Sequence, residues 1–277
     1  MLLISQLFIY PIKSLAGIAV DKARVTDRGF EYDRRWMLVD LNNRFISQRE
    51  VHQMALIKVQ VTDKGLRVNH TTKNSSFTIP FLPATSEFAD VTIWDDTCTG
   101  QFVSDEADKW FSNMLEMSCR LVYMTDETTR VTDPRYAPDD SITSFSDAYP
   151  FLLIGQASLD DLNSRLNEPL PMNRFRPNIV FTGGTPFQED MMGTFSVGDI
   201  TFYGVKLCAR CVMTTIDQET AIKYKEPLKT LARYRFKDNK ILFGQNLAHE
   251  GLGEVSIGDT LRVLKLNYED RFVMPAK

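Results

Sequence analysis

The sequence is poor in cysteine, carries little net charge and has no long apolar run. Four cysteines among 277 residues are too few for the disulfide framework of a secreted protein, so we expect free thiols and a cytoplasmic protein. A formal net charge of −4 argues against general binding of nucleic acid or of an anionic membrane. No apolar run approaches the roughly 18 residues that span a bilayer, and the first residues lack a signal-peptide pattern. We therefore expect neither nucleic acid nor membrane as a partner.

Several common catalytic motifs are also missing. There is no glycine-rich phosphate loop, no Gly-x-Ser-x-Gly elbow and no His-Glu-x-x-His pair, which disfavours P-loop enzymes, serine hydrolases and zincins. Cys98 and Cys119 stand alone, and the three histidines are isolated from one another. A structural zinc site needs four ligands, so a zinc site would lack a complete ligand set.

The residues that are present predict a mainly β protein with a few helices (α+β). Short alternating apolar and polar runs, separated by Asn and Gly turns, fill residues 1–97 and return after residue 178. We expect residues 1–97 to form an N-terminal β-barrel-like domain and residues 98–277 to form a helical connector and a second β-rich domain. The pattern leaves open that the two ends of the chain pack together.

Two helices and one long loop are expected in the middle of the chain. One helix should follow Ser104, because apolar residues from Ala107 to Leu115 recur at helical spacing after an acidic first turn. Another should begin at Ser158, whose spacing to Asp161 resembles a capping box. Residues 125–145 show no periodicity, and a loop of that length is typical of a lid or binding loop.

The sharpest local motif is Cys208-Ala209-Arg210-Cys211, at the end of a strand-like run. This spacing suits a zinc half-site, a dithiol couple or a single metal thiolate, and two buried cysteines without a task are a further reading. The following Val-Met-Thr-Thr-Ile is a poor helix former, which disfavours a thioredoxin-like couple. Arg210 would favour a thiolate if its side chain points back toward either sulfur.

Cationic and amide side chains stand in several turn-like settings. They include Lys13 and Ser14, Arg34, and the run that holds Arg176 and Asn178. Arg and Lys recognise phosphate, and Asn can read the edge of a heterocycle. If these side chains converge, they would suit a phosphorylated ligand with a ring, whereas each taken singly reads as an ordinary surface residue.

Eight motifs follow one another along the chain, namely YPIKS (10–14), DRRW (33–36), FSDAYPFLL (145–153), ASLDDLN (157–163), NRFRPNIV (173–180), CARCVMTT (208–215), EPLKTL (226–231) and FGQN (243–246). With these motifs in this order the chain resembles the MOSC family, and more narrowly the amidoxime-reducing components and bacterial reductases of N-hydroxylated bases. The resemblance implies an N-terminal MOSC β-barrel domain followed by a MOSC β-barrel domain. It also implies molybdenum cofactor, a molybdenum held by a phosphorylated pyranopterin dithiolene.

The resemblance carries site roles onto single residues. Cys211 matches the molybdenum ligand, and a soft thiolate suits that metal. Cys211, Asp147 and Arg210 are the implied catalytic residues. The implied cofactor-binding residues are Lys13, Ser14, Arg34, Asp147, Arg176, Asn178, Arg210 and Cys211. Ala209 and Ala148 depart from the family pattern, where hydroxyl residues are frequent.

The resemblance further implies a molybdenum-dependent oxidoreductase that reduces amidoximes, hydroxylamines or N-hydroxylated bases. Some bacterial relatives carry an iron–sulfur domain with closely spaced cysteines, but no cysteine follows Cys211. We therefore expect a separate iron–sulfur or flavin protein to deliver the electrons. Two alternatives remain open, a non-catalytic carrier of the cofactor and a sulfur-transfer protein that forms a persulfide on Cys208 or Cys211.

Overall fold

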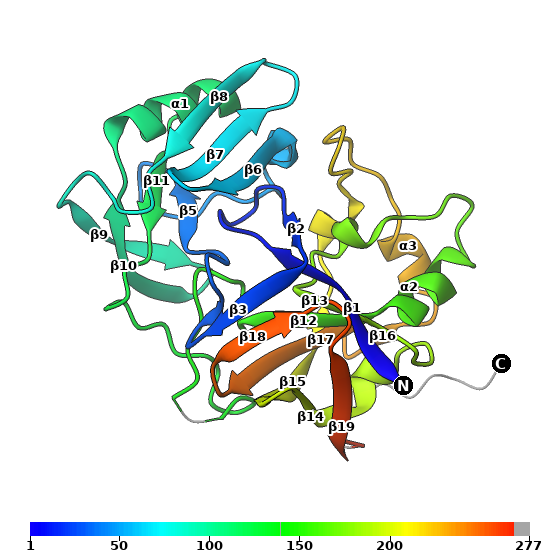
Figure 1. Ribbon diagram of the computed structural model, residues 1–277. Coiled ribbons are helices and arrows are strands. Elements are labelled where there is room, and N and C mark those ends of the chain that lie inside the picture. Colours follow the sequence, from blue (N-terminus) through cyan, green and yellow to red (C-terminus); the bar gives the residue numbers. More distant parts are fainter. Residues whose placement is uncertain (139, 269–277) are drawn as a thin grey trace.

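The computed structural model describes residues 1–138 and 140–268, and strands dominate this part of the chain (Figure 1). The mainly β fold class predicted from the sequence is confirmed. The chain forms two bodies of β-structure. Residues 36–123 form the one that we call the first body, and the other is a barrel. No helix among the described residues is both long and apolar enough to cross a membrane.

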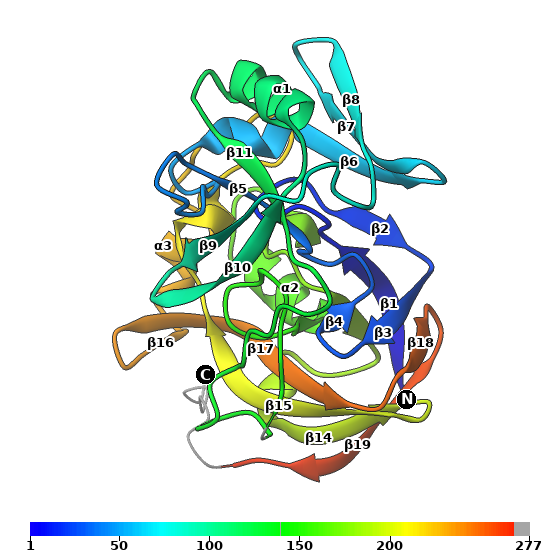
Figure 2. The ribbon, with the colours of Figure 1, turned by 90° about the vertical axis from the view of Figure 1, so that its left-hand side faces the viewer.

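The barrel is a ring of seven strands, closed because its first strand also pairs with its last. In Figure 2 the barrel lies below the other body. In spatial order these strands are β12 (Phe151–Gly155), β13 (Ile179–Thr182), β1 (Leu2–Ile9), β19 (Thr260–Leu266), β14 (Met192–Val197), β15 (Ile200–Ala209) and β17 (Lys240–Glu250). Two short strands, β2 (Ile18–Val20) and β16 (Phe236–Lys237), extend it. Alternate residues of these strands point inward and form one apolar cluster, as the period of two requires.

Both ends of the chain contribute to the barrel. Strand β1 pairs antiparallel with β13, at Leu3 opposite Thr182, and with β19, at Leu2 opposite Leu261. Nearby, β3 (Lys22–Thr26) pairs with β4 (Gly29–Phe30) and with β18 (Gly253–Ser256). Strands before residue 31 are thus held by strands after residue 178.

The other body has two small sheets and one helix. One sheet contains β5 (Trp36–Val39), β11 (Arg120–Tyr123), β10 (Asp96–Phe102) and β9 (Phe88–Ile93), and the other contains β6 (Ile57–Thr62), β7 (Gly65–His70) and β8 (Ser75–Ile79). The 3-10 helix η1 (His52–Leu56) precedes β6. Helix α1 (Asp105–Leu115) confirms the prediction, since Ser104 Oγ accepts a hydrogen bond from Ala107 N at its start.

The second predicted helix begins two residues before its predicted start. Helix α2 (Gln156–Asn163) has Gly155, not Ser158, at its N-cap. The Ser158 hydroxyl is fully buried, donates to Glu189 Oε2 and accepts from Phe187 N, so it joins α2 to the 3-10 helix η3 (Gln188–Met191). Three further short elements are η2 (Met172–Arg174), η4 (Val212–Thr215) and α3 (Leu228–Leu231).

The described part of segment 125–145 has no helix or strand, as predicted, but it is anchored to the body of the protein. The Arg130 side chain is buried, pairs with Asp96 at 2.6 Å and donates to the carbonyls of Ser144 and Ser146. These contacts do not fit the expectation of a lid. They fix the backbone that leads into Asp147.

Candidate functional site

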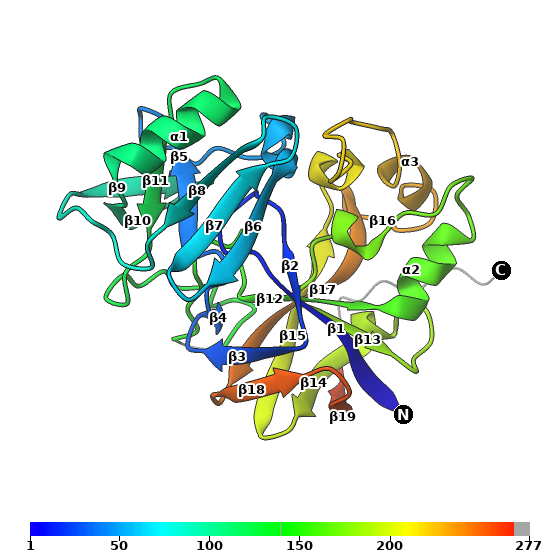
Figure 3. The same cartoon turned by 45° about the horizontal axis from the view of Figure 1, so that its top comes forward.

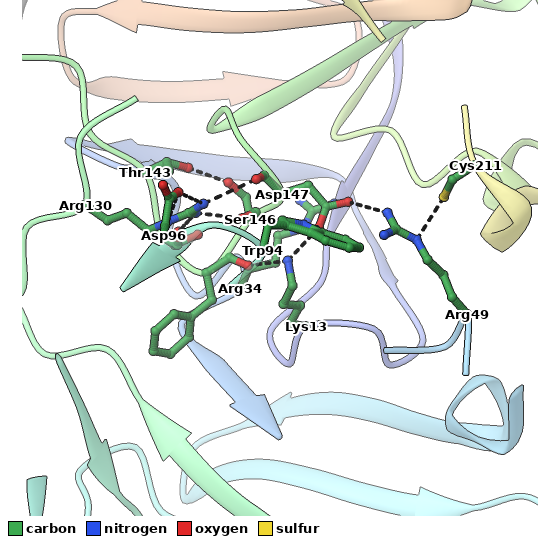
Figure 4. Close-up of polar contacts among 12 residues, drawn as sticks. Lys13, Arg34, Arg49, Trp94, Asp96, Arg130, Thr143, Ser146, Asp147 and Cys211 are labelled. Atoms are coloured by element: carbon green, nitrogen blue, oxygen red, sulfur yellow. Dashed lines mark hydrogen bonds and ion pairs between the residues drawn. The ribbon is translucent and has the colours of Figure 1, made fainter. Parts of the chain in front are cut away.

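A cavity of about 460 Å³ lies where the two bodies face each other. Its walls include all eight residues that the resemblance implied for the site, namely Lys13, Ser14, Arg34, Asp147, Arg176, Asn178, Arg210 and Cys211. They come from widely separated parts of the chain, and Figure 4 shows how several of them converge. The structure thus brings the predicted residues together.

Cys211 lies in the cavity wall two residues after the end of strand β15, as the residue that precedes η4. The backbone N–H of Arg210 donates to Ile241 O at 2.7 Å, which fixes this turn against β17. The guanidinium of Arg210 donates to Cys208 Sγ at 3.0 Å and to Phe175 O at 2.6 Å. Burial raises the pKa of the Cys208 thiol, against the opposing effect of Arg210. Arg210 therefore contacts Cys208 rather than Cys211.

Arg49 is the cation that contacts the Cys211 sulfur, and sequence reasoning missed it. Its Nε donates to Cys211 Sγ at 3.1 Å, and its Nη2 lies 3.5 Å from Asp147 Oδ2 (Figure 4). The guanidinium also stacks over the Trp94 ring at 4.0 Å. Arg49 comes from the loop between β5 and η1, so the first body supplies a group directly to the thiol. A lone Arg in a polar run carries no signal for this role.

Asp147 faces the cavity as an ionised carboxylate. Lys13 Nζ donates to its Oδ1 at 2.7 Å, and Trp94 Nε1 donates to the same atom at 3.3 Å. Desolvation alone would raise the pKa of Asp147, but the charges of Lys13 and Arg49 and these hydrogen bonds hold it well below its usual range. Burial lowers the pKa of Lys13 to about 8, and Asp147 limits that fall.

Arg34 and Arg176 both lie against the ring of one buried tyrosine. Their guanidinium carbons lie 4.5 Å and 4.2 Å from the centre of the Tyr10 ring. Arg34 is held by the buried carboxylate of Asp33, whereas Arg176 donates to a backbone carbonyl, that of Leu15, at 2.7 Å. Burial lowers the pKa of Arg176 to about 10, so it stays charged at neutral pH. Two adjacent cations thus face the cavity.

Asn178 is used within the protein and does not present a free amide to the cavity. Its Oδ1 accepts from Arg34 Nη1 at 3.0 Å and from Leu152 N at 3.3 Å, and its Nδ2 donates to Phe8 O at 3.2 Å. The residue is 1% exposed. The geometry makes Asn178 a support for Arg34 rather than a reader of a heterocycle edge.

Strained backbone concentrates around the cavity. Ser14, Arg34, Trp94 and Arg176 all have φ between 49° and 67°, in the left-handed region. Non-glycine residues adopt this conformation at a cost of about 1–2 kcal/mol each, and such residues cluster at functional sites. This strain points to the cavity as the site.

The cavity also contains unused donors. Arg174 Nη2 and Arg210 Nε are buried without a hydrogen-bond partner among the described residues. Among the residues that the structure describes, no group of three or more His, Cys, Asp or Glu side chains could hold a metal ion. A metal at Cys211 would therefore need ligands from a cofactor, and the cationic walls suit an anionic one.

Comparison with known proteins agrees with this geometry. Residues 1–118 match the MOSC N-terminal beta barrel domain and residues 140–262 match the MOSC domain. The chain is 34% identical to mitochondrial amidoxime-reducing component 1 of Mus musculus, over 94% of this chain and 82% of that protein. It is 32% identical to mitochondrial amidoxime reducing component 2 of Rattus norvegicus, over 92% and 81%.

A different kind of relative matches only in part. The chain is 31% identical to the molybdenum cofactor sulfurase of Oryza sativa subsp. japonica, over 91% of this chain but 33% of that protein. These likenesses define a MOSC-domain protein with a MOSC N-terminal beta barrel. The chain belongs to this family and is related to the amidoxime-reducing components.

Proposed function

We propose that the protein is a molybdenum-cofactor-dependent reductase of N-hydroxylated compounds. The substrate N–O bond would break while two electrons and two protons enter, and the parent nitrogen compound and water would leave. The observation that carries the proposal is the position of Cys211, which lies in a cavity with buried cations in a chain 34% identical to a protein named for amidoxime reduction. Bound cofactor would supply two-electron redox chemistry that the side chains lack.

The residues present fit that cofactor. A thiolate is a soft ligand that suits a metal already bound by sulfur. Arg34, Arg176 and Arg210 supply charged donors of the kind that bind phosphate, and one nitrogen of Arg210 has no partner within the described residues. Cys211 would hold the metal, while Lys13, Ser14, Arg34 and Arg176 would hold the pterin and phosphate.

Other residues have roles around the ligand thiol. Arg49 donates a hydrogen bond to Cys211 Sγ, which stabilises negative charge on that sulfur. Lys13 Nζ holds a proton that can exchange near neutral pH, and it lies against Asp147, the carboxylate that faces the cavity. Lys13 is therefore placed to exchange a proton with substrate and product, while the ionised Asp147 holds Lys13 in position.

The direct test is molybdenum content and turnover in matched cysteine variants. Wild type, Cys211→Ala and Cys208→Ala are prepared in a cofactor-competent host and analysed for molybdenum and pterin. We expect near-stoichiometric molybdenum in wild type and Cys208→Ala, and at least a tenfold loss in Cys211→Ala. The loaded wild type should reduce benzamidoxime with reduced methyl viologen as donor. A loaded and active Cys211→Ala protein would falsify the assignment.

A second candidate function is sulfur transfer, which the match to the sulfurase favours. It predicts sulfane sulfur on Cys208 or Cys211 in protein that lacks molybdenum. Cyanide-released thiocyanate, measured on the same three proteins, would detect it. A third reading, a cofactor carrier, predicts bound molybdenum with no reduction of benzamidoxime. The expected separate electron donor and the cytoplasmic location remain proposals.

A further inference from the structure

The positive charge of the chain is concentrated in one stretch. Residues 206–240 contain nine Lys and Arg against four Asp and Glu, a formal charge of +5, in a chain whose total is −4. The rest of the sequence therefore carries −9. Such an asymmetry favours a local encounter with an anionic partner without making the whole protein a binder of polyanions.

This stretch contains Cys211 and forms part of the cavity wall. Lys206 on β15 and Lys240 on β17 line the cavity itself. After η4 the chain turns back on itself, with Ile216 bridged to Lys223 and Tyr224 N donating to Thr215 O. Figure 3 shows this yellow and gold segment beside α3, on the side of the barrel that faces the first body. The returning chain therefore lies against the turn that begins at Cys211.

We use the name basic rim for the five lysines of this stretch that form no ion pair with a described residue and for its three exposed apolar side chains near Cys211, namely Lys206, Lys223, Lys225, Lys229 and Lys240 with Val212, Ile222 and Tyr224. Val212 is 38% exposed, Ile222 53% and Tyr224 52%. None of the five lysines forms an ion pair with another described residue, whereas Lys58 and Lys73 in the first body do. Exposed apolar groups that alternate with lysines, as in Ile222-Lys223-Tyr224-Lys225, are typical of a transient docking surface.

We propose that the basic rim is the docking surface for an acidic electron-transfer protein. The inference rests on the proposed function, because each reduction needs two electrons that enter the cavity from outside. A one-electron carrier would dock twice per turnover and be released oxidised each time. Charge complementarity gives fast, salt-sensitive association and leaves the complex weak enough to separate.

Two other occupants fit less well. The residues outside 206–240 carry a formal charge of −9, so a second copy of the chain could also bind the rim. A second copy, however, brings no electrons from outside. Nucleic acid likewise brings no electrons to the cavity. The position of the rim at the cavity that holds Cys211 favours the electron donor.

The test compares two charge reversals in cofactor-loaded protein. Lys223→Glu/Lys225→Glu changes the rim, and Lys64→Glu/Arg67→Glu makes the same charge change on exposed residues of the β6–β7 hairpin. Both variants and wild type reduce benzamidoxime, first with reduced methyl viologen and then with an acidic [2Fe–2S] ferredoxin kept reduced by its reductase. The KM for ferredoxin is measured at several salt concentrations.

We expect equal viologen-driven rates for the three proteins. With ferredoxin, the rim variant should show a KM raised about tenfold at low salt and a weaker salt dependence, while the hairpin variant resembles wild type. An unchanged KM in the rim variant, or an equal rise in both variants, would contradict the proposed docking surface and leave the proposed function standing. Loss of a salt-sensitive dimer in the rim variant, with ferredoxin kinetics unchanged, would assign the rim to a second copy. If loaded wild type fails even with viologen, the proposed function falls and this inference with it.

Discussion

At the scale of single residues, the role of Asn178 depends on what surrounds it. Its amide oxygen accepts from Arg34 and from Leu152 N, so it fixes the orientation of a cation that faces the cavity. The motif around Asn178 predicted that the residue belongs to the site, and the cavity contains it. Residue type alone could not show that the amide oxygen and the amide nitrogen both have hydrogen-bond partners within the protein.

We predict that Asn178→Ala weakens both the fold and the site. The change leaves Leu152 N buried without its acceptor and frees Arg34, at a cost of about 2 kcal/mol. The free energy of unfolding, from urea titration, and the molybdenum content should both fall. Asn163→Ala is the matched control. Asn163 is the last residue of α2, lies away from the cavity, and makes a similar pair of hydrogen bonds to the backbone of Leu170. If both variants retain molybdenum like wild type, Asn178 does not support the site.

Arg49 and Trp94 belong to the site but were not predicted from the sequence. Lys13, Ser14, Arg34, Asp147 and Cys211 belong to recognisable motifs, and the structure places them in one cavity. Arg49 and Trp94 come from a loop and a hairpin turn whose positions depend on how the first body faces the barrel. No local pattern encodes that relation, so their contacts with Asp147 and Cys211 could be found only in three dimensions.

At the scale of elements, the joint between α2 and η3 contains a buried carboxyl group. Glu189 is fully buried, accepts from Ser158 and lies next to Asp190, which is paired with Arg235 at 2.6 Å. Burial, with Asp190 nearby, raises the pKa of Glu189 from 4.5 to about 7. The sequence around Ser158 predicted an N-cap there. In the structure the Ser158 hydroxyl instead bonds the buried Glu189 carboxyl group.

We predict that this carboxyl group makes stability depend on pH. Between pH 4.5 and 7 the folded state keeps a proton that the unfolded chain releases, so the free energy of unfolding falls as pH rises, by up to about 3 kcal/mol. Glu189→Gln keeps the shape and cannot ionise, so its stability should be flatter across this range. Urea titrations at several pH values give both slopes, and equal slopes would contradict the assignment.

At the scale of the whole molecule, the barrel draws strands from both ends of the chain. Alternating runs and turn residues were enough to predict that strands dominate, because those patterns are local. The ring closure was not predictable in this way, since it depends on β1 lying between β13 and β19 across more than 170 positions of sequence. The sequence only left open that the two ends meet.

We predict that the two bodies unfold together. Leu7→Ala removes a barrel side chain from β1 that is 1% exposed, at a cost of about 3 kcal/mol. All three tryptophans lie between residues 36 and 110, in the first body, so their fluorescence reports on the part that the substitution does not touch. The fluorescence and circular-dichroism midpoints in urea should move together. A fluorescence midpoint that stays at the wild-type value would show independent bodies.

The place of β1 also has a consequence during synthesis on the ribosome. This strand is made before β19, which ends at Leu266, so the edge of β1 that pairs with β19 must wait until more than 250 further residues have been made. An unpaired apolar strand edge is a template for aggregation. The growing chain therefore carries an unprotected edge until β19 has been made, and its yield in cells should depend on the chaperones that shield nascent chains.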